Sequence, residues 1–97
     1  MKLSENEIVT YLSQLEGWKC KDDKWIEKKY RFREFMTGIQ FVQKVAQIAE
    51  RLNHHPLISI DYRMVTLRLT TWSEGGLTVL DFKSAAEFDQ ITDVDTT

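Results

Sequence analysis

Apolar residues near the start of the chain recur at helical spacing. Ser4 and Glu7 form the pattern of a capping box, in which the side chain of each residue accepts a hydrogen bond from the backbone N–H of the other. Apolar positions then follow every three or four residues as far as Leu15. Gly17 comes directly after, and glycine favours the conformation found just past a helix end. The spacing predicts a first helix over residues 5–15.

The next segment changes to a spacing of two. Residues 18–20 and 25–30 have the composition of strands, and the polar residues 21–24 between them favour a tight turn. Ile26, Lys28 and Tyr30 fall on one face of the second strand and Trp25 on the other. This segment predicts a β-hairpin.

A long helix is predicted over residues 33–52. Its apolar residues form two adjacent stripes, wider than packing on one sheet requires. The excess suggests a subunit interface in addition to a core. Gly38 lies inside this helix at a cost of about 1 kcal/mol relative to alanine, and the sequence offers no reason for it. Asn53 is a plausible helix end, and Pro56 moves His55 toward an extended backbone.

The last third repeats the hairpin-then-helix order. Residues 58–62 and 65–70 alternate as two strands, residues 73–76 form a loop, and Thr78 with Asp81 opens a third helix as a second capping box. The polar tail, residues 93–97, is expected to fray. The fold class predicted is α+β: one domain over residues 1–97, with a four-stranded antiparallel sheet, three helices on one face, and the order α-β-β-α-β-β-α.

Composition narrows the class of protein. With 42% hydrophobic and 29% charged residues, the 97-residue chain resembles an ordinary globular domain. A net charge of −2 gives no electrostatic case for nucleic acid, and no apolar run is long enough for a membrane span. One cysteine, Cys20, and a polar N-terminus without a secretory signal favour the cytoplasm.

The only two histidines, His54 and His55, adjoin the only proline, Pro56. Histidine can donate and accept a proton near neutral pH, so the pair is a candidate acid–base site. Two histidines at a helix C-terminus can equally serve the helix dipole alone. Glu50 lies four residues before His54 and shares its helix face if the helix persists that far.

Trp72 stands on the polar side of its predicted strand, just before a Gly-Gly loop. It can wall a flat ligand, pack against another subunit, or fold back as a cap if the strand ends at Thr71. Two other kinds of site lack the residues that they require. Two histidines and one cysteine do not make a structural zinc site. Gly75-Gly76 is not followed by the Lys-Ser or Lys-Thr pair of a phosphate loop.

Together these residues resemble a known signature. Glu50-Arg51-Leu52-Asn53-His54-His55-Pro56, followed by Tyr62, Trp72 and Asp81, is similar to the pattern of the pterin-4a-carbinolamine dehydratases. Tyr30-Arg31-Phe32 before the long helix and Gly75-Gly76-Leu77-Thr78 before the last helix resemble the same family. The resemblance spans most of the chain.

The resemblance implies dehydration of 4a-hydroxytetrahydrobiopterin to quinonoid dihydrobiopterin, without a metal or organic cofactor. It implies His55 as the base near N5, His54 as the group that assists the departing hydroxyl, and Asp81 as the residue that fixes a neighbour or the pterin. The catalytic set is therefore His54, His55, Trp72 and Asp81. The implied substrate-binding set is Glu50, Pro56, Tyr62, Thr70 and Thr71.

Two positions depart from the best-known members. Trp72 replaces a third histidine, and an indole cannot transfer a proton at neutral pH, so a lower rate is expected. Ile58 replaces a tryptophan found in many members, which alters a wall of the pocket. The family also implies a homodimer or homotetramer. The alternative function is a non-catalytic oligomeric scaffold or protein-partner factor on the same fold.

Overall fold

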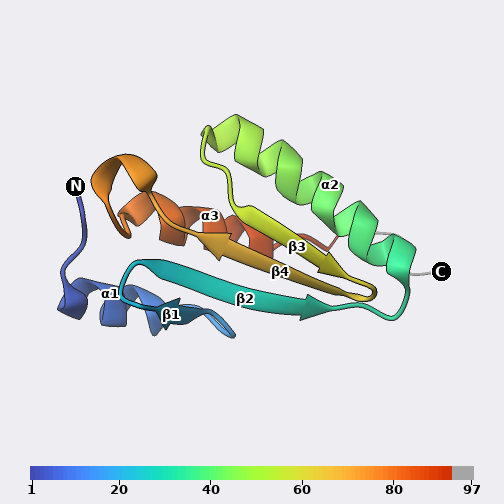
Figure 1. Cartoon of the computed structure of the whole chain (residues 1–97), viewed down its shortest axis with the longest axis horizontal. Helices are drawn as coiled ribbons and strands as arrows, with labels where there is room; N and C mark the ends of the chain where they lie inside the picture. Colours follow the sequence, from blue (N-terminus) through green and yellow to red (C-terminus); the bar gives the residue numbers. More distant parts are fainter. Residues whose placement is uncertain (93–97) are drawn as a thin grey trace.

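Four antiparallel strands form one sheet in the computed structural model, in the order β1-β2-β4-β3 (Figure 1). The strands are β1 (Lys19–Lys21), β2 (Trp25–Arg31), β3 (Leu57–Asp61) and β4 (Met64–Leu69). The helices are α1 (Glu5–Leu12), α2 (Phe35–Leu52), α3 (Val79–Asp89) and the short 3-10 helix η1 (Trp72–Glu74). The structure describes residues 1–92, so the expectation for residues 93–97 lies outside the described part.

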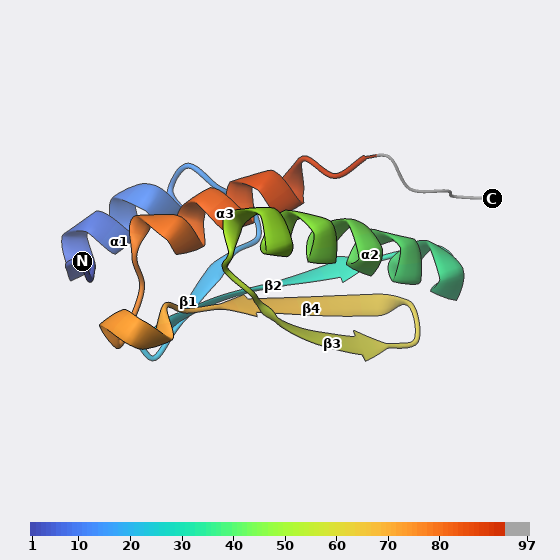
Figure 2. The same cartoon turned by 90° about the horizontal axis from the view of Figure 1, so that it is seen from above.

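All three α-helices cover the same face of the sheet (Figure 2). The alternation along the central strands explains this, because every second side chain points to the helices. Ile26 of β2 and Val65, Leu67 and Leu69 of β4 are completely buried on that face. No helix of residues 1–92 covers the opposite face. The predicted fold class and element order are confirmed.

Helix α1 ends three residues earlier than its apolar spacing predicts. The capping box of Ser4 and Glu7 forms as expected, but the helix stops at Leu12. The Ser13 hydroxyl donates to the carbonyl of Thr10 at 2.6 Å, and the next amides bond carbonyls only three residues back. The apolar pattern continues because this tight turn still packs on the core, so spacing alone could not locate the helix end.

Gly38 faces the sheet, which the sequence does not reveal. A Cβ atom built at this position would lie 3.4 Å from the ring of Phe32 and 3.5 Å from a methyl group of Val65. These are ordinary van der Waals distances, so a methyl group fits at this position, whereas a larger side chain would overlap Phe32 and Val65.

Helix α2 and the edge strand β3 leave apolar side chains in contact with solvent. Phe41, Val45 and Ala49 of α2 are buried, whereas Phe35 and Met36 are 44% and 58% exposed. All five residues of β3 are exposed, although three of them are leucine or isoleucine. The wide apolar arc predicted for α2 thus has a surface counterpart, while self-association stays a prediction.

The partly buried carboxylate of Asp89 connects the end of α3 to the sheet. Asp89 accepts hydrogen bonds from the Trp18 indole at 3.0 Å, the Lys28 ammonium at 2.8 Å and the Tyr30 hydroxyl at 2.5 Å. Burial, together with the bond to Asp89, raises the pKa of Tyr30 far above its usual value, so this phenol remains a neutral donor.

Candidate functional site

The histidine pair opens onto a cavity where β3 begins and β4 ends. The cavity has a volume of about 480 Å³. Its walls combine the segment after α2 with the segment after β4. The lining residues are Asn53, His54, His55, Pro56, Leu57, Thr70, Thr71, Trp72 and Ser73.

The end of α2 explains why the two imidazoles diverge. Asn53 adopts the left-handed conformation, with φ of 52°, and ends the helix. The amide of His54 then bonds the carbonyl of Ala49 at 3.0 Å, as in a Schellman-type helix end. Pro56 continues the chain into the extended backbone of β3, so adjacent histidines leave from a bend rather than from a helix.

His54 is held by a buried carboxylate of α3. Its Nε2 lies 2.6 Å from Oδ1 of Asp81, whose side chain is completely buried. The other oxygen, Oδ2, accepts the Thr71 hydroxyl at 2.8 Å and the Thr78 amide at 2.9 Å. Three donors and no acceptor suit an ionised carboxylate. This network assigns the proton of a neutral His54 to Nε2 and leaves Nδ1 as its second ring nitrogen.

Asp81 occupies this place because it is also part of a helix cap. Thr78 is the N-cap of α3, and Asp81, three residues later, completes the predicted capping box. A carboxylate is favourable there because the helix dipole is positive at its N-terminus. The capping pattern therefore identified Asp81 and Thr78 as a pair. It gave no sign that their partner across the fold would be His54.

His55 is paired with Glu50 on the surface. Its Nε2 lies 2.5 Å from Oε2 of Glu50, and the two side chains are 56% and 77% exposed. Glu50 therefore holds one of the two histidines. The condition for Glu50 to share a helix face with His54 is not met, because α2 ends at Leu52 and His54 turns toward Asp81 instead.

Trp72 lies beyond the end of its strand, as the third of the predicted alternatives requires, but its indole is too exposed to act as a cap. Strand β4 ends at Leu69, Thr71 forms an isolated bridge with Gly76, and Trp72 begins the helix η1. Its side chain lies on the rim of the cavity, 71% exposed, with its ring edge-on to Trp25 at 5.0 Å between centroids. The indole therefore presents a large free aromatic surface beside the two histidines.

The predicted substrate-binding residues divide into two groups. Pro56, Thr70 and Thr71 line the cavity, but the Thr70 hydroxyl donates to the carbonyl of Lys24 at 2.5 Å and the Thr71 hydroxyl donates to Asp81. Tyr62 lies at the far end of β3 in the turn to β4, 69% exposed, and does not line this cavity. Within one chain, its position does not support the expected contact with the same ligand.

Two other classes of site have no counterpart in residues 1–92. No helix in this range is long and apolar enough to cross a bilayer. The histidine, cysteine and acidic side chains of the same range form no group of three or more placed to hold a metal ion.

Comparison with known proteins gives one family. The sequence model described as pterin 4 alpha carbinolamine dehydratase matches residues 1–91. A relative from Sulfolobus acidocaldarius is 41% identical over 94% of this chain and 99% of its own length. Relatives from Picosynechococcus and Koribacter versatilis are 43% and 44% identical, over 93% and 92% of this chain and 97% and 94% of their own lengths. All three are provisionally named pterin-4-alpha-carbinolamine dehydratases.

Solved structures share the fold. A protein of Brucella melitensis described as a transcriptional coactivator/pterin dehydratase superposes with a TM-score of 0.88 and 36% identity, over 92% of this chain and 96% of that one. A pterin dehydratase-like protein described as a RuBisCO assembly factor superposes with a TM-score of 0.65 over 76% of this chain and 87% of its own. At 18% identity, the second likeness concerns the fold alone.

Proposed function

The chain belongs to the pterin 4 alpha carbinolamine dehydratase family, and from this premise we propose that it dehydrates 4a-hydroxytetrahydrobiopterin in the cytoplasm. The product is quinonoid dihydrobiopterin, so the protein acts as a hydro-lyase in tetrahydrobiopterin recycling. The observation that supports this reaction best is the divergent histidine pair, in which each imidazole has its own carboxylate and both line one cavity.

His54 assists the departure of the hydroxyl group. Hydroxide is a poor leaving group, so the C4a–O bond breaks readily only when an acid donates a proton to the oxygen. With Nε2 bonded to Asp81, the proton for this step comes from Nδ1 of the imidazolium. The buried carboxylate supports the positive charge of that ring, as a buried aspartate does for other catalytic imidazoles.

His55 accepts the proton that the pterin loses. As the C–O bond breaks, the N5 lone pair forms the C=N bond, and the proton on N5 must go to a base. His55 lines the cavity, and Glu50 occupies its Nε2, so Nδ1 is the nitrogen offered to the ring. Acid–base steps of this kind contribute typically about 10²–10⁴-fold to a rate.

Trp72 provides an aromatic wall rather than a third proton carrier. A flat pterin can pack against the exposed indole, and the indole N–H can donate a hydrogen bond. Because the indole cannot release its proton at neutral pH, the chain depends on two histidines, and we expect a lower rate than in family members with three.

The test is a rate measurement on the purified protein and two histidine variants. The protein should accelerate water loss from the enzymatically generated carbinolamine over buffer near neutral pH. His55→Ala should remove most of this acceleration without unfolding the chain, since His55 is exposed. A wild-type protein that gives no acceleration, or a His54→Ala, His55→Ala double variant that keeps it all, would refute the proposed chemistry.

The alternative, a non-catalytic oligomeric scaffold, is favoured by one feature. The exposed apolar residues of β3 and of the start of α2 form a surface suited to a second copy, and we propose a homodimer or homotetramer on this basis. Light scattering of the wild type and of Ile60→Lys measures the molar mass of each and so its oligomeric state. A stable oligomer without turnover supports the scaffold, whereas turnover that the variant keeps separates catalysis from assembly.

A further inference from the structure

The uncovered face of the sheet carries a charge opposite to that of the whole chain. Cross-strand pairing places five cationic and two acidic side chains on this face, a local balance of +3 in a chain of net charge −2. The cations are Lys19, Lys21, Lys29, Arg31 and Arg68, and the acids are Glu27 and Asp61. One face of the sheet is therefore basic although the net charge of the chain is negative.

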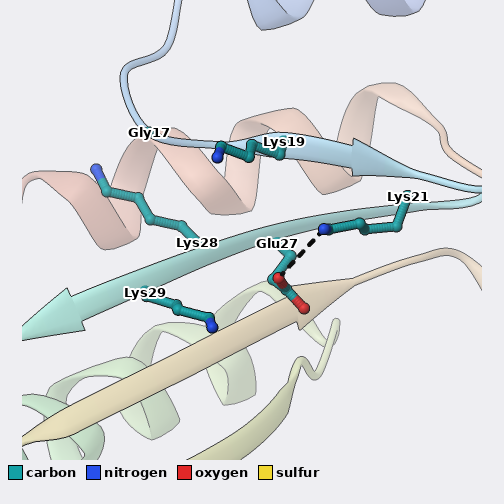
Figure 3. Close-up of a pocket in the computed structure, with 6 residues that line it drawn as sticks. All are labelled: Gly17, Lys19, Lys21, Glu27, Lys28 and Lys29. Atoms are coloured by element: carbon teal, nitrogen blue, oxygen red, sulfur yellow. Dashed lines mark ion pairs between the residues drawn. The ribbon is translucent and has the colours of Figure 1, made fainter.

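One carboxylate, that of Glu27, lies near three of these five cations. Glu27 lies opposite Lys19 on β1 and opposite Arg68 on β4, and its Oε2 is 4.0 Å from Nζ of Lys21. Figure 3 shows Lys21 turned toward Glu27, with Lys19 and Lys29 nearby and Lys28 extending away from this group. The residues in this view line a hollow of about 310 Å³. A single carboxylate leaves an excess of positive charge here.

Arg68 connects this basic face to the candidate active site. It is the direct cross-strand partner of Leu57, which lines the cavity, and opposite Cβ atoms lie about 4.5–5.5 Å apart. Its guanidinium carbon is 5.9 Å from the centroid of the Trp25 ring, and Trp25 in turn contacts Trp72 on the cavity rim. Lys21 lies opposite Trp25 on the next strand. Arg68 is thus a cation of this face that lies next to a residue lining the cavity, although it does not line the cavity itself.

Protection of an exposed sheet edge does not explain Arg68. Lysines on edge strands discourage pairing with other chains, and this accounts for Lys19 and Lys21 on β1. Strand β4 is central in the sheet and has no free edge. Glu50, the acidic partner of His55, is already bonded to that histidine. A planar guanidinium can donate two parallel hydrogen bonds, which suits a phosphate or carboxylate ligand.

We propose that Arg68, supported by Lys21, binds an anionic substituent, phosphate or carboxylate, on a pterin whose ring occupies the cavity. This inference rests on the proposed function and extends it, because it names the substrate class as pterins with an acidic side chain. It assigns Arg68 to substrate selection and leaves proton transfer to the histidines.

The test compares ligands that differ in their anionic group. Isothermal titration calorimetry measures the binding affinity of each ligand for the wild type, Arg68→Gln and Arg31→Gln. The ligands are dihydrobiopterin, dihydroneopterin triphosphate, dihydrofolate and inorganic triphosphate. Arg31 is a matched control, because it lies on the same face but six residues along β2 from Trp25, roughly 20 Å away. Arg68→Lys tests rescue by retained charge.

We expect at least one anionic pterin to bind about tenfold more tightly than dihydrobiopterin at about 50 mM salt, and the advantage to shrink at about 0.5 M. Arg68→Gln should abolish it, whereas Arg31→Gln should keep it. The phosphate and carboxylate ligands distinguish the two anion sources. Inorganic triphosphate should bind weakly.

Two outcomes overturn the inference: equal affinity for neutral and anionic pterins, or an equal loss in both arginine variants. Either can occur while dehydration of the neutral substrate is normal, so the proposed function would survive. Conversely, an Arg68-dependent preference in a protein without dehydratase activity would support the inference and refute the reaction.

Discussion

Asp81→Asn tests whether the buried carboxylate determines the protonation pattern of His54. Asparagine keeps the shape of aspartate but replaces one acceptor oxygen with an NH2 group that can only donate. If the oxygen remains with the Thr71 and Thr78 donors, the amide group faces His54. His54 must then present a lone pair at Nε2 and carry its proton on Nδ1, the opposite tautomer.

The size of the effect follows from the contacts. The variant retains two of the three donors to the carboxylate and loses one charge-assisted bond, which corresponds to about 1.5–3 kcal/mol of unfolding free energy. The imidazolium of His54 also loses its counter-charge. We therefore expect the rate of dehydration to fall by about 10²–10⁴-fold, the range of one acid–base step. The loss of activity should far exceed the loss expected from partial unfolding.

Three measurements check this prediction: stopped-flow rates, urea unfolding and ¹⁵N spectra of the imidazole ring. Asp89→Asn is the matched control, because Asp89 also has two donors on one oxygen and one on the other. Its single donor is the indole of Trp18, which has no alternative tautomer. This control should lose at least as much stability and keep its rate. A wild-type rate, or an unchanged Nε2–H tautomer, in Asp81→Asn would refute the reasoning.

Two further predictions concern stability. Gly38→Leu should destabilise the protein by about 1–3 kcal/mol in urea unfolding, because the new side chain would overlap Phe32 and Val65. Gly38→Ala should be close to neutral. An equal loss of stability in both variants would contradict the packing argument. Because the pKa of Tyr30 is raised in the folded chain, its contribution is fully present below the unfolded pKa of about 10 and is lost at higher pH, at about 1.4 kcal/mol per pH unit. Tyr30→Phe should flatten this alkaline slope, and an unchanged slope would show that another group titrates.

Local patterns were sufficient to predict the architecture. The change between spacings of three to four and of two gave the element order, and the two capping boxes located the starts of α1 and α3. These signals depend on residues close together in the sequence. The end of α1 and the role of Gly38 depend on packing between distant segments, so spacing could not reveal them.

The same distinction applies to the site. Apart from Tyr62, the predicted residues line the cavity or bond to its histidines. The sequence did not give their pairing, because the left-handed backbone at Asn53 decides which histidine meets which acid. The free aromatic face of Trp72 depends on where β4 stops, and alternation along the strand continued past that point. The basic face is visible only after the strands are paired, since its cations come from three separate strands.

Asp81 belongs both to a helix cap and to the proposed reaction, and this has a consequence for tracing that reaction among relatives. A chain that had abandoned catalysis would still need an acid at this position to begin its last helix, so natural selection would retain the aspartate for folding alone. His55 and Glu50 lie on the surface, where their loss costs the fold little. The loss of His55 or Glu50 from a related sequence is therefore the more informative sign that the protein has lost its catalytic activity.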